Sequence, residues 1–388
     1  MVETQEALDQ MVVEAGTDAV VGLDTEFLRE KTYRAKLCLV QVATKHGIYL
    51  VDPLSGQDLS GLASLISDPD VEVLVHAGRQ DFEIFFERYG AVPKNIFDVQ
   101  LAAAFAGYGA SLPYGRLVET ITKTTLTKGE SYTDWCRRPL TESQLKYAAD
   151  DVRYLHVVAA TIKDNLFASG RAEWARAEME FFSDGSLYTT EPADAWRRVS
   201  GRGTLSGKQM GILRALAAWR ETAAQKRDIP RGWVIKDQSL IEIARKAPTN
   251  VGALKSLRGF APKEAERSGT DILAAIERGK DAPHFDAPPT PSRAAQARAR
   301  TLSGLADAIV RSRCEAAGIA TELVATRGEL EAVLSDIFSS GELSKEHRLL
   351  EGWRRDLAGD AVVALAEGRI AVRSVDKHPY IEEVVLDE

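Results

Sequence analysis

The sequence predicts an α/β domain, with a mixed sheet flanked by helices, followed by two small all-α domains. Up to about residue 180, apolar runs of strand length alternate with segments of helical periodicity, which is typical of layered α/β architecture. From Ser206 onward the apolar residues follow the 3.6-residue period of helices. A chain of 388 residues is also too long for one ordinary core, because domains commonly contain roughly 100 to 200 residues.

The patterns place individual elements in the first domain. Strands are expected at 19–25, 36–43, 47–51 and 71–75, and helices at 59–66, 80–89, 98–106, 114–121 and 141–166. In the helical part, Ser206 is a candidate N-cap, and helices are expected at 238–246, 251–257, 262–278, 297–317, 326–339, 345–357 and 360–367. The predicted domains are 1–180, 205–281 and 297–375, separated by a connector at 181–204 and a proline-rich linker at 282–296, with a tail at 376–388 that has no clear structural signal.

The charge of the chain is distributed unevenly. The net charge is −8 overall, but the segment 201–300 carries +9, while 1–200 carries −10 and 301–388 carries −7. A basic block in an acidic protein is expected of a module that contacts phosphates. A helical bundle whose solvated surface favours Lys and Arg would give the same charge.

Several classes of protein are excluded or disfavoured. No run approaches the ~18 apolar residues of a membrane helix, and the N-terminus is acidic rather than a basic targeting segment, so we expect a cytoplasmic protein that does not bind membranes. The sequence contains no phosphate-binding P-loop. The glycines at 107 and 109 follow a helical pattern and lack the third glycine of a dinucleotide fingerprint, so no nucleotide cofactor is expected.

The three cysteines, Cys38, Cys136 and Cys314, are far apart in sequence and lack the Cys-x-x-Cys spacing. This pattern argues against a disulfide framework and against a zinc site. We expect all three to be reduced, partly buried core residues.

Asp24 and Glu26 are the most informative residues of the chain. They end an apolar run, one residue apart, and alternate residues of a strand project from the same face. Two carboxylates held this close repel each other unless they take up a proton or bind a hard cation such as Mg²⁺ or Mn²⁺. An isolated Asp-x-Glu at a strand end is more often a solvated turn, so the interpretation depends on partners elsewhere in the chain.

Those partners follow downstream. Asp81 comes shortly after the strand expected at 71–75, near the start of a helix, and Tyr147 and Asp151 share one face of a later helix because they are four residues apart. Asp150 competes with Asp151, but neighbouring helical residues point about 100° apart, so the Tyr-x-x-x-Asp spacing selects Asp151. Two other polar residues are better explained structurally: His76 as a hydrogen-bonded core histidine and Asp98 as a helix N-cap.

Taken together, Asp24, Glu26, Asp81, Tyr147 and Asp151 resemble the site of the DEDD superfamily of 3′-to-5′ exonucleases, in the branch that has tyrosine before the last aspartate. Within it, the chain is most similar to the bacterial ribonuclease D family. The resemblance extends through the runs from Leu37 to Ala43, from Phe97 to Ala103 and from Ser131 to Thr141. Residues from about 205 to 280 resemble the helicase-and-RNase-D C-terminal (HRDC) domain, and 297–375 resembles a second, divergent copy. The acidic charge of this copy fits a packing role at least as well as phosphate binding.

The resemblance implies a ribonuclease H-like fold and phosphodiester hydrolysis with two divalent ions, Mg²⁺ or Mn²⁺. Asp24, Glu26, Asp81 and Asp151 would hold the ions, with Asp24 between them. Tyr147 would orient the attacking water rather than act as a free base, because a tyrosine hydroxyl ordinarily stays protonated at neutral pH.

Further residues are candidates for contact with the substrate. Phe27 and Leu28 follow the acidic pair and would meet the terminal bases, with core packing as the alternative. The remaining candidates are basic residues near the site or in the basic segment: Arg137, Arg138, Arg227, Arg231 and Lys236.

These observations predict a monomeric, metal-dependent 3′-to-5′ exoribonuclease that produces nucleoside 5′-monophosphates. The family resemblance alone implies that its partner is RNA with a free 3′ end, such as precursor tRNA. Two alternatives stay open: an RNA-binding protein whose exonuclease fold has lost turnover, and an exonuclease that acts on DNA.

Overall fold

A computed structural model describes residues 1–127, 129–130, 133–282, 291–340 and 347–386. The N-terminal domain contains a five-stranded mixed sheet in the order β3-β2-β1-β4-β5, in which β1 pairs antiparallel with β2 and parallel with β4. The strands are β1 (Val20–Leu28), β2 (Lys36–Ala43), β3 (Ile48–Val51), β4 (Glu72–Val75) and β5 (Ile96–Asp98). The predicted α/β class and the four expected strands are confirmed. The three-residue strand β5 was not expected, because it is too short to show a period.

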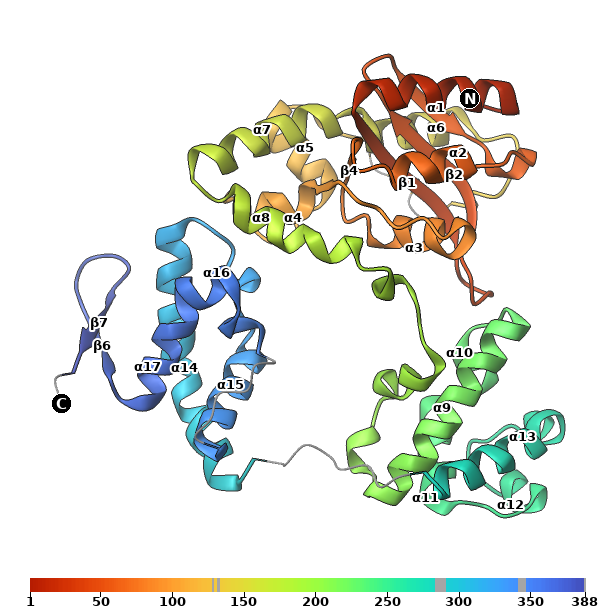
Figure 1. Cartoon of the computed structure of the whole chain (residues 1–388), viewed down its shortest axis with the longest axis vertical. Coiled ribbons are helices and arrows are strands. Elements are labelled where there is room, and N and C mark those ends of the chain that lie inside the picture. Colours follow the sequence, from red (N-terminus) through yellow and green to blue (C-terminus); the bar gives the residue numbers. More distant parts are fainter. Residues whose placement is uncertain (128, 131–132, 283–290, 341–346, 387–388) are drawn as a thin grey trace.

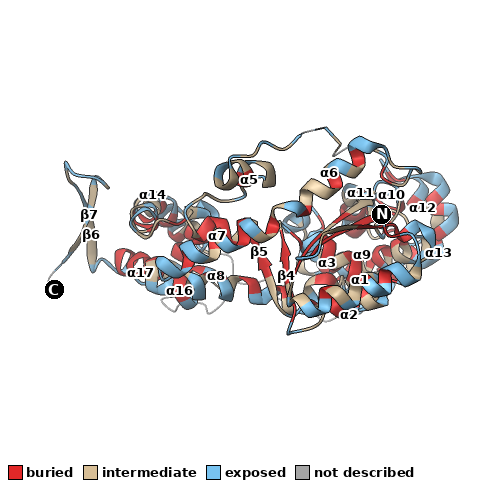
Figure 2. Ribbon diagram, turned by 90° about the horizontal axis from the view of Figure 1, so that it is seen from above, coloured by how far each residue is buried: buried red, intermediate tan, exposed pale blue. Residues whose placement is uncertain are grey.

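Helices surround this sheet (Figure 1). They are α1 (Gln5–Asp18), α2 (Ser60–Ile66), α3 (Arg79–Tyr89), α4 (Val99–Phe105), α5 (Tyr114–Thr122), α6 (Glu142–Arg153), α7 (Leu155–Ala168) and α8 (Ala172–Met179). Figure 2 shows that β4 and β5 are buried between them. The helix expected at 141–166 is two helices, α6 and α7, that meet at Tyr154. The Tyr154 amide donates a hydrogen bond to the Tyr114 hydroxyl (3.3 Å), a tertiary contact that periodicity does not reveal.

A connector of 3₁₀ turns leads to the first helical domain. The turns are η2 (Glu180–Ser183), η3 (Gly185–Tyr188), η4 (Pro192–Arg198) and η5 (Arg202–Thr204). The helices are α9 (Gly207–Arg227), α10 (Arg231–Val234), α11 (Asp237–Lys246), α12 (Val251–Lys255) and α13 (Pro262–Lys280). Ser206 caps α9 through a capping box with Gln209, as expected. This domain has its own hydrophobic core, which also takes in Tyr33 from the β1–β2 loop.

In the ranges described, the C-terminal region is helical up to residue 367 and then forms a hairpin. Its elements are α14 (Arg293–Ala317), η6 (Thr321–Leu323), α15 (Arg327–Ser340), η7 (Arg348–Leu350), α16 (Gly352–Arg354), the π-helical η8 (Arg355–Gly359), α17 (Asp360–Glu367), β6 (Ile370–Ser374) and β7 (Ile381–Val385). The single helix expected at 345–357 is not present in the described residues 347–357, because Glu351 takes an extended conformation (φ −121°, ψ 142°) between η7 and α16. The residues at the centre of the expected linker, 283–290, lie outside the described ranges.

The C-terminal region and the N-terminal domain share one hydrophobic core. Trp353 stacks on Trp174 and meets the edge of Phe105, with ring centroids 5.2 Å apart in both pairs. Arg354 forms a buried ion pair with Glu178 of α8. In Figure 1 this region (blue) lies below α8, whereas the first helical domain (green) lies below the β1–β2 loop.

Candidate active site

Strand β1 presents Asp24 and Glu26 on one face of the sheet. Across the antiparallel pairing, Asp24 lies opposite Gln41 and Glu26 opposite Leu39 of β2, and directly opposed residues share a face. Helix α6 packs on this face, since Leu39 belongs to the same apolar cluster as Ala148 of α6. The acidic pair therefore lies between the sheet and α6.

Helix α6 supplies the next two residues. It begins with a capping box between Thr141 and Gln144, which fixes the start of the helix. One oxygen each from Asp24, Glu26 and Asp151 all lie within 4.8 Å of one another, a group that could hold a metal ion. Tyr147 lies one turn before Asp151, and its ring packs against Trp135 with centroids 5.9 Å apart.

Asp81 lies in the first turn of α3 and is 7% exposed. Its carboxylate accepts a hydrogen bond from the hydroxyl of Thr25, the residue between Asp24 and Glu26. Asp81 is not one of the three residues in the 4.8 Å group, yet its charge raises the pKa of both Asp24 and Glu26. The structure thus brings the fourth acid beside the other three and anchors it to the same strand.

The carboxyl groups of this cluster have raised pKa values. Burial, followed by the charges of its acidic neighbours, raises the pKa of Asp24 well above its usual range and the pKa of Glu26 to about 8. Burial also raises the pKa of Asp81 and of Asp151 to about 7. Four carboxyl groups with such values hold protons at neutral pH unless a cation is bound, so the cluster could hold a divalent ion.

Gln41 provides an independent sign that the site fits a metal. Its side chain is fully buried opposite Asp24, and neither its Nε2 nor its Oε1 has a hydrogen-bond partner among the described residues. A buried amide without partners costs about 1 to 3 kcal/mol. An ionised Asp24 or a water on a bound ion could supply a partner, so the residues present fit the implied group.

Asp150 points elsewhere, as expected from the helical geometry. It accepts a hydrogen bond from Arg153 (2.7 Å), one helical turn away. Two other expectations are confirmed: Asp98 caps α4 by accepting hydrogen bonds from the amides of Gln100 and Leu101, and His76 contacts the Leu112 carbonyl (2.9 Å).

The other candidates for substrate contact near the site differ in how many contacts they already make within the protein. Phe27 and Leu28 are half-buried and pack against apolar clusters, although Leu28 also lines a cavity. Arg138 donates to both carboxylate oxygens of Asp52 (2.5 and 2.7 Å) and to the Cys38 and Trp135 carbonyls, which ties the segment before α6 to the sheet. Arg137 is exposed.

Two basic candidates in the first helical domain also have protein partners. Arg227 pairs with Glu264 (2.8 Å) and donates to Ser268, and Arg231 pairs with Glu221 (2.5 Å). Lys236 is exposed at the start of α11. A role in RNA contact stays a prediction for all three.

The expectation of three reduced cysteines is wrong for one pair. Cys38 and Cys136 form a disulfide, with Cα atoms 5.1 Å apart, whereas Cys314 is free and buried. Separation in sequence does not limit proximity in space here, because β2 and the segment before α6 belong to one apolar cluster.

Tyr114 is a neighbour of the site that sequence reasoning missed. Burial, with smaller contributions from the charges of Asp151 and Asp24, raises the pKa of its hydroxyl above the usual range. Its ring also lies 5.4 Å from that of His76. No spacing rule connects residue 114 to residues 24 and 151, so only the tertiary fold reveals it.

The fold and the site together define a class of enzyme. Residues 1–166 match the model of a 3′-5′ exonuclease family, and residues 209–276 match the HRDC domain. The first domain is therefore a 3′-5′ exonuclease domain, followed by an HRDC domain.

Comparison with whole proteins narrows this class. A ribonuclease D from Granulibacter bethesdensis is 38% identical over 356 residues, which cover 91% of this chain and 88% of the relative. One from Gluconacetobacter diazotrophicus is 37% identical over 380 residues, which cover 95% and 93%. The crystal structure of Escherichia coli RNase D, an exoribonuclease involved in structured RNA processing, is similar with a TM-score of 0.82 at 32% identity, over 95% of this chain and 98% of that one. The chain belongs to the ribonuclease D family, and it is accordingly a hydrolase of the exoribonuclease class.

Among the described residues, no helix is both long and apolar enough to cross a membrane.

Proposed function

We propose that this chain trims the 3′ ends of precursor tRNA and related RNAs, releasing nucleoside 5′-monophosphates. The observation that carries the proposal is the convergence of Asp24, Glu26 and Asp151 within 4.8 Å, from a strand and a helix that are far apart in sequence. Half-buried carboxylates at this spacing suit hard divalent cations, which take oxygen ligands.

Asp24, Glu26 and Asp151 would hold the metal, with Asp81 supporting them from α3. Two divalent ions, Mg²⁺ or Mn²⁺, would supply an activated water and stabilise the departing oxygen of the phosphodiester. The chain itself contributes orientation. Thr25 holds the Asp81 carboxylate, and the packing of Trp135 against Tyr147 limits how the tyrosine can turn.

Tyr147 would position the attacking water through its hydroxyl. Because it shares a face of α6 with Asp151, both side chains approach the same reacting phosphate. This arrangement fits hydrolysis at the end of a strand, where one terminal nucleotide at a time reaches the acidic cluster.

The RNA substrate is supported by family membership and by the segment 201–300, whose net charge of +9 suits a folded polyanion. A single-stranded 3′ tail that projects from a folded RNA could reach the cluster while this segment grips the body of the RNA. We also propose that the chain works as a monomer in the cytoplasm.

The test is mass-resolved product analysis on a 3′-extended tRNA, on the matching mature tRNA and on a DNA tail of the same sequence. We expect stepwise loss of 5′-monophosphates from the extended RNA with Mg²⁺ or Mn²⁺, and none with chelator. Preferential degradation of the DNA tail would contradict the RNA substrate, and binding without cleavage would contradict turnover.

A further inference from the structure

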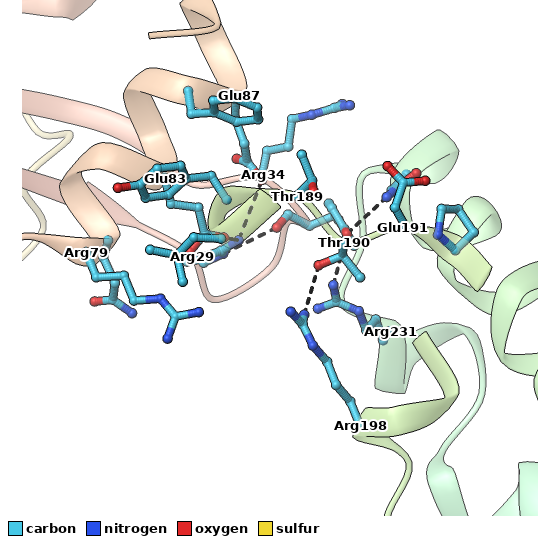
Figure 3. Close-up of a pocket in the computed structure, with 17 residues that line it drawn as sticks. Arg29, Arg34, Arg79, Glu83, Glu87, Thr189, Thr190, Glu191, Arg198 and Arg231 are labelled. Atoms are coloured by element: carbon cyan, nitrogen blue, oxygen red, sulfur yellow. Dashed lines mark hydrogen bonds and ion pairs between the residues drawn. The ribbon is translucent and has the colours of Figure 1, made fainter. Parts of the chain in front are cut away.

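A cavity of about 720 Å³ lies where the exonuclease domain, the connector and the first helical domain meet (Figure 3). Its walls come from the loop after β1, from α3, from the connector and from α9 and α10. Five of its lining residues are arginines: Arg29, Arg34, Arg79, Arg198 and Arg231. Nothing in the proposed mechanism uses this cavity.

Two of these arginines are neutralised by the protein. Arg29 pairs with Glu83 (2.6 Å) and lies 3.8 Å from Glu87. Arg231 donates to both oxygens of Glu221 and stacks over the Tyr33 ring, 4.7 Å from its centroid. The charges of Arg29 and Arg231 are therefore already balanced by carboxylates of the protein.

The other three arginines keep their charge available. Within the described ranges, the side chains of Arg34 and Arg79 form no hydrogen bond or ion pair, and that of Arg198 donates only to the neutral Thr190 hydroxyl (2.9 Å). Figure 3 shows Arg79 on the α3 side and Arg198 on the connector side. One carboxylate at the rim, Glu191, is likewise without an ion pair in this part of the chain, so unpaired positive charge predominates.

The position of the cavity connects it to the acidic cluster. Arg29 lies immediately after β1, three residues beyond Glu26, and Arg79 precedes Asp81 by two residues at the start of α3. The segments that follow Glu26 and lead to Asp81 therefore also carry one wall of the cavity. A polyanion whose end lies among the carboxylates could continue into this space.

The opposite wall is fixed relative to the exonuclease domain. The backbone amides of Tyr33 and Arg34 both donate to the Asp228 carboxylate (3.1 and 3.0 Å), and the Tyr33 hydroxyl donates to Glu221. These contacts join the β1–β2 loop to the first helical domain. The β1–β2 loop thus holds the first helical domain against the exonuclease domain at this wall of the cavity.

We propose that this cavity binds the sugar-phosphate backbone of the single-stranded RNA upstream of the 3′ nucleotide, with Arg79 and Arg198 contacting phosphates. Guanidinium groups bind phosphate oxygens in a bidentate manner, which suits a backbone site without base specificity. The inference rests on the proposed function, since it assumes that RNA enters the acidic cluster by its 3′ end.

The test compares Arg79→Gln/Arg198→Gln with the matched control Arg88→Gln/Lys94→Gln. The control removes two exposed positive charges from the exonuclease domain at positions that do not line the cavity. Binding of labelled single-stranded RNA is measured in chelator, so that no hydrolysis occurs, with a dinucleotide and with an oligonucleotide of about 12 residues. Melting curves verify that both variants fold.

We expect the cavity variant to bind the longer RNA about ten-fold to a hundred-fold more weakly than the control does, with an effect below about two-fold on the dinucleotide. Its salt dependence, the slope of log K against log salt concentration, should fall by about 1.4, because each phosphate contact to a single strand contributes about 0.7. Arg79→Lys/Arg198→Lys should retain the slope, because it retains the charge.

Equal affinities of the cavity variant and the control for the longer RNA would overturn the proposal. This failure is distinguishable from failure of the proposed function. If wild-type protein with Mn²⁺ degrades RNA from the 3′ end but the two variants bind alike, the cavity assignment is wrong and the activity stands. If the wild-type protein degrades no RNA at all, the proposed function itself is contradicted.

Discussion

Binding of a divalent metal to the acidic cluster should release protons. In the metal-free protein the pKa of Glu26 is about 8, and the pKa values of Asp81 and Asp151 are about 7, because burial penalises their charged forms. At pH 7 the three groups together hold about two protons, which an incoming cation must displace. Asp24, whose pKa is also raised, would add to this number.

The consequence is a steep dependence of metal affinity on pH. With at least about two protons released, the apparent affinity for Mn²⁺ should rise at least about a hundred-fold between pH 6.5 and 7.5. The slope should decrease above pH 8, as Glu26, whose pKa is about 8, loses its proton. An ordinary solvent-exposed carboxylate site would show almost no dependence in this range, because its groups titrate near pH 4.

Isothermal titration calorimetry measures this directly. Titrating Mn²⁺ into chelator-treated protein in buffers with different ionisation enthalpies gives the number of protons released at each pH. Release of at least about two protons at pH 7, fewer toward pH 9, would agree with the structure. Release of no protons, with affinity constant from pH 6 to pH 8, would refute the coupling of buried carboxylates that we describe.

Four further results are expected. Asp24→Asn should reduce the rate of hydrolysis by at least about 10³-fold, because stabilisation of the transition state by the metal is worth several kcal/mol. Filter binding should show that the affinity for RNA is unchanged. Substantial residual activity would remove Asp24 from the site. Tyr147→Phe should lower kcat about a hundred-fold with little change in calorimetric Mn²⁺ affinity, and near-normal turnover would exclude the hydroxyl from the mechanism. Gln41→Leu should raise the free energy of unfolding in urea by about 1 to 2 kcal/mol when chelator is present, because the buried amide then lacks a hydrogen-bond partner. The same substitution should weaken Mn²⁺ binding. A loss of stability in chelator would contradict this. The melting temperature in chelator should fall as pH rises from about 5 to 8, because the folded state holds protons on Glu26, Asp81 and Asp151 that the unfolded chain releases near pH 4. Saturating Mn²⁺ should remove this fall. A melting temperature that rises with pH would contradict the assigned direction of the pKa shifts.

The parts of the site that the sequence predicted depend on local geometry. Asp24 and Glu26 share a strand face, and Tyr147 and Asp151 share a helix face, because two and four residues are the natural spacings of these elements. The same local rules identified Ser206 and Asp98 as caps. Strands β1 to β4 could be predicted from the sequence for the same reason, because each of them contains a continuous apolar run.

The features that the sequence did not predict depend on contacts between distant segments. The orphaned amide of Gln41 and the proximity of Tyr114 to Asp151 follow from how sheet and helices pack. The pairing of Cys38 with Cys136 and the break at Tyr154 have the same origin. The packing of Trp353 on Trp174 could not be predicted either, because the acidic composition of the C-terminal region left its role open.

The most direct test of the metal site compares two adjacent aspartates of α6. Asp151 lies in the acidic cluster, whereas Asp150 pairs with Arg153, so Asp151→Asn and Asp150→Asn make the same chemical change one residue apart. Mn²⁺ binding, measured by electron paramagnetic resonance with hydrolysis of a 3′-extended RNA in the same samples, should be lost together with activity in Asp151→Asn and retained in Asp150→Asn. Equal behaviour of the two variants, or metal binding and activity retained in Asp151→Asn, would contradict the assignment of the active site.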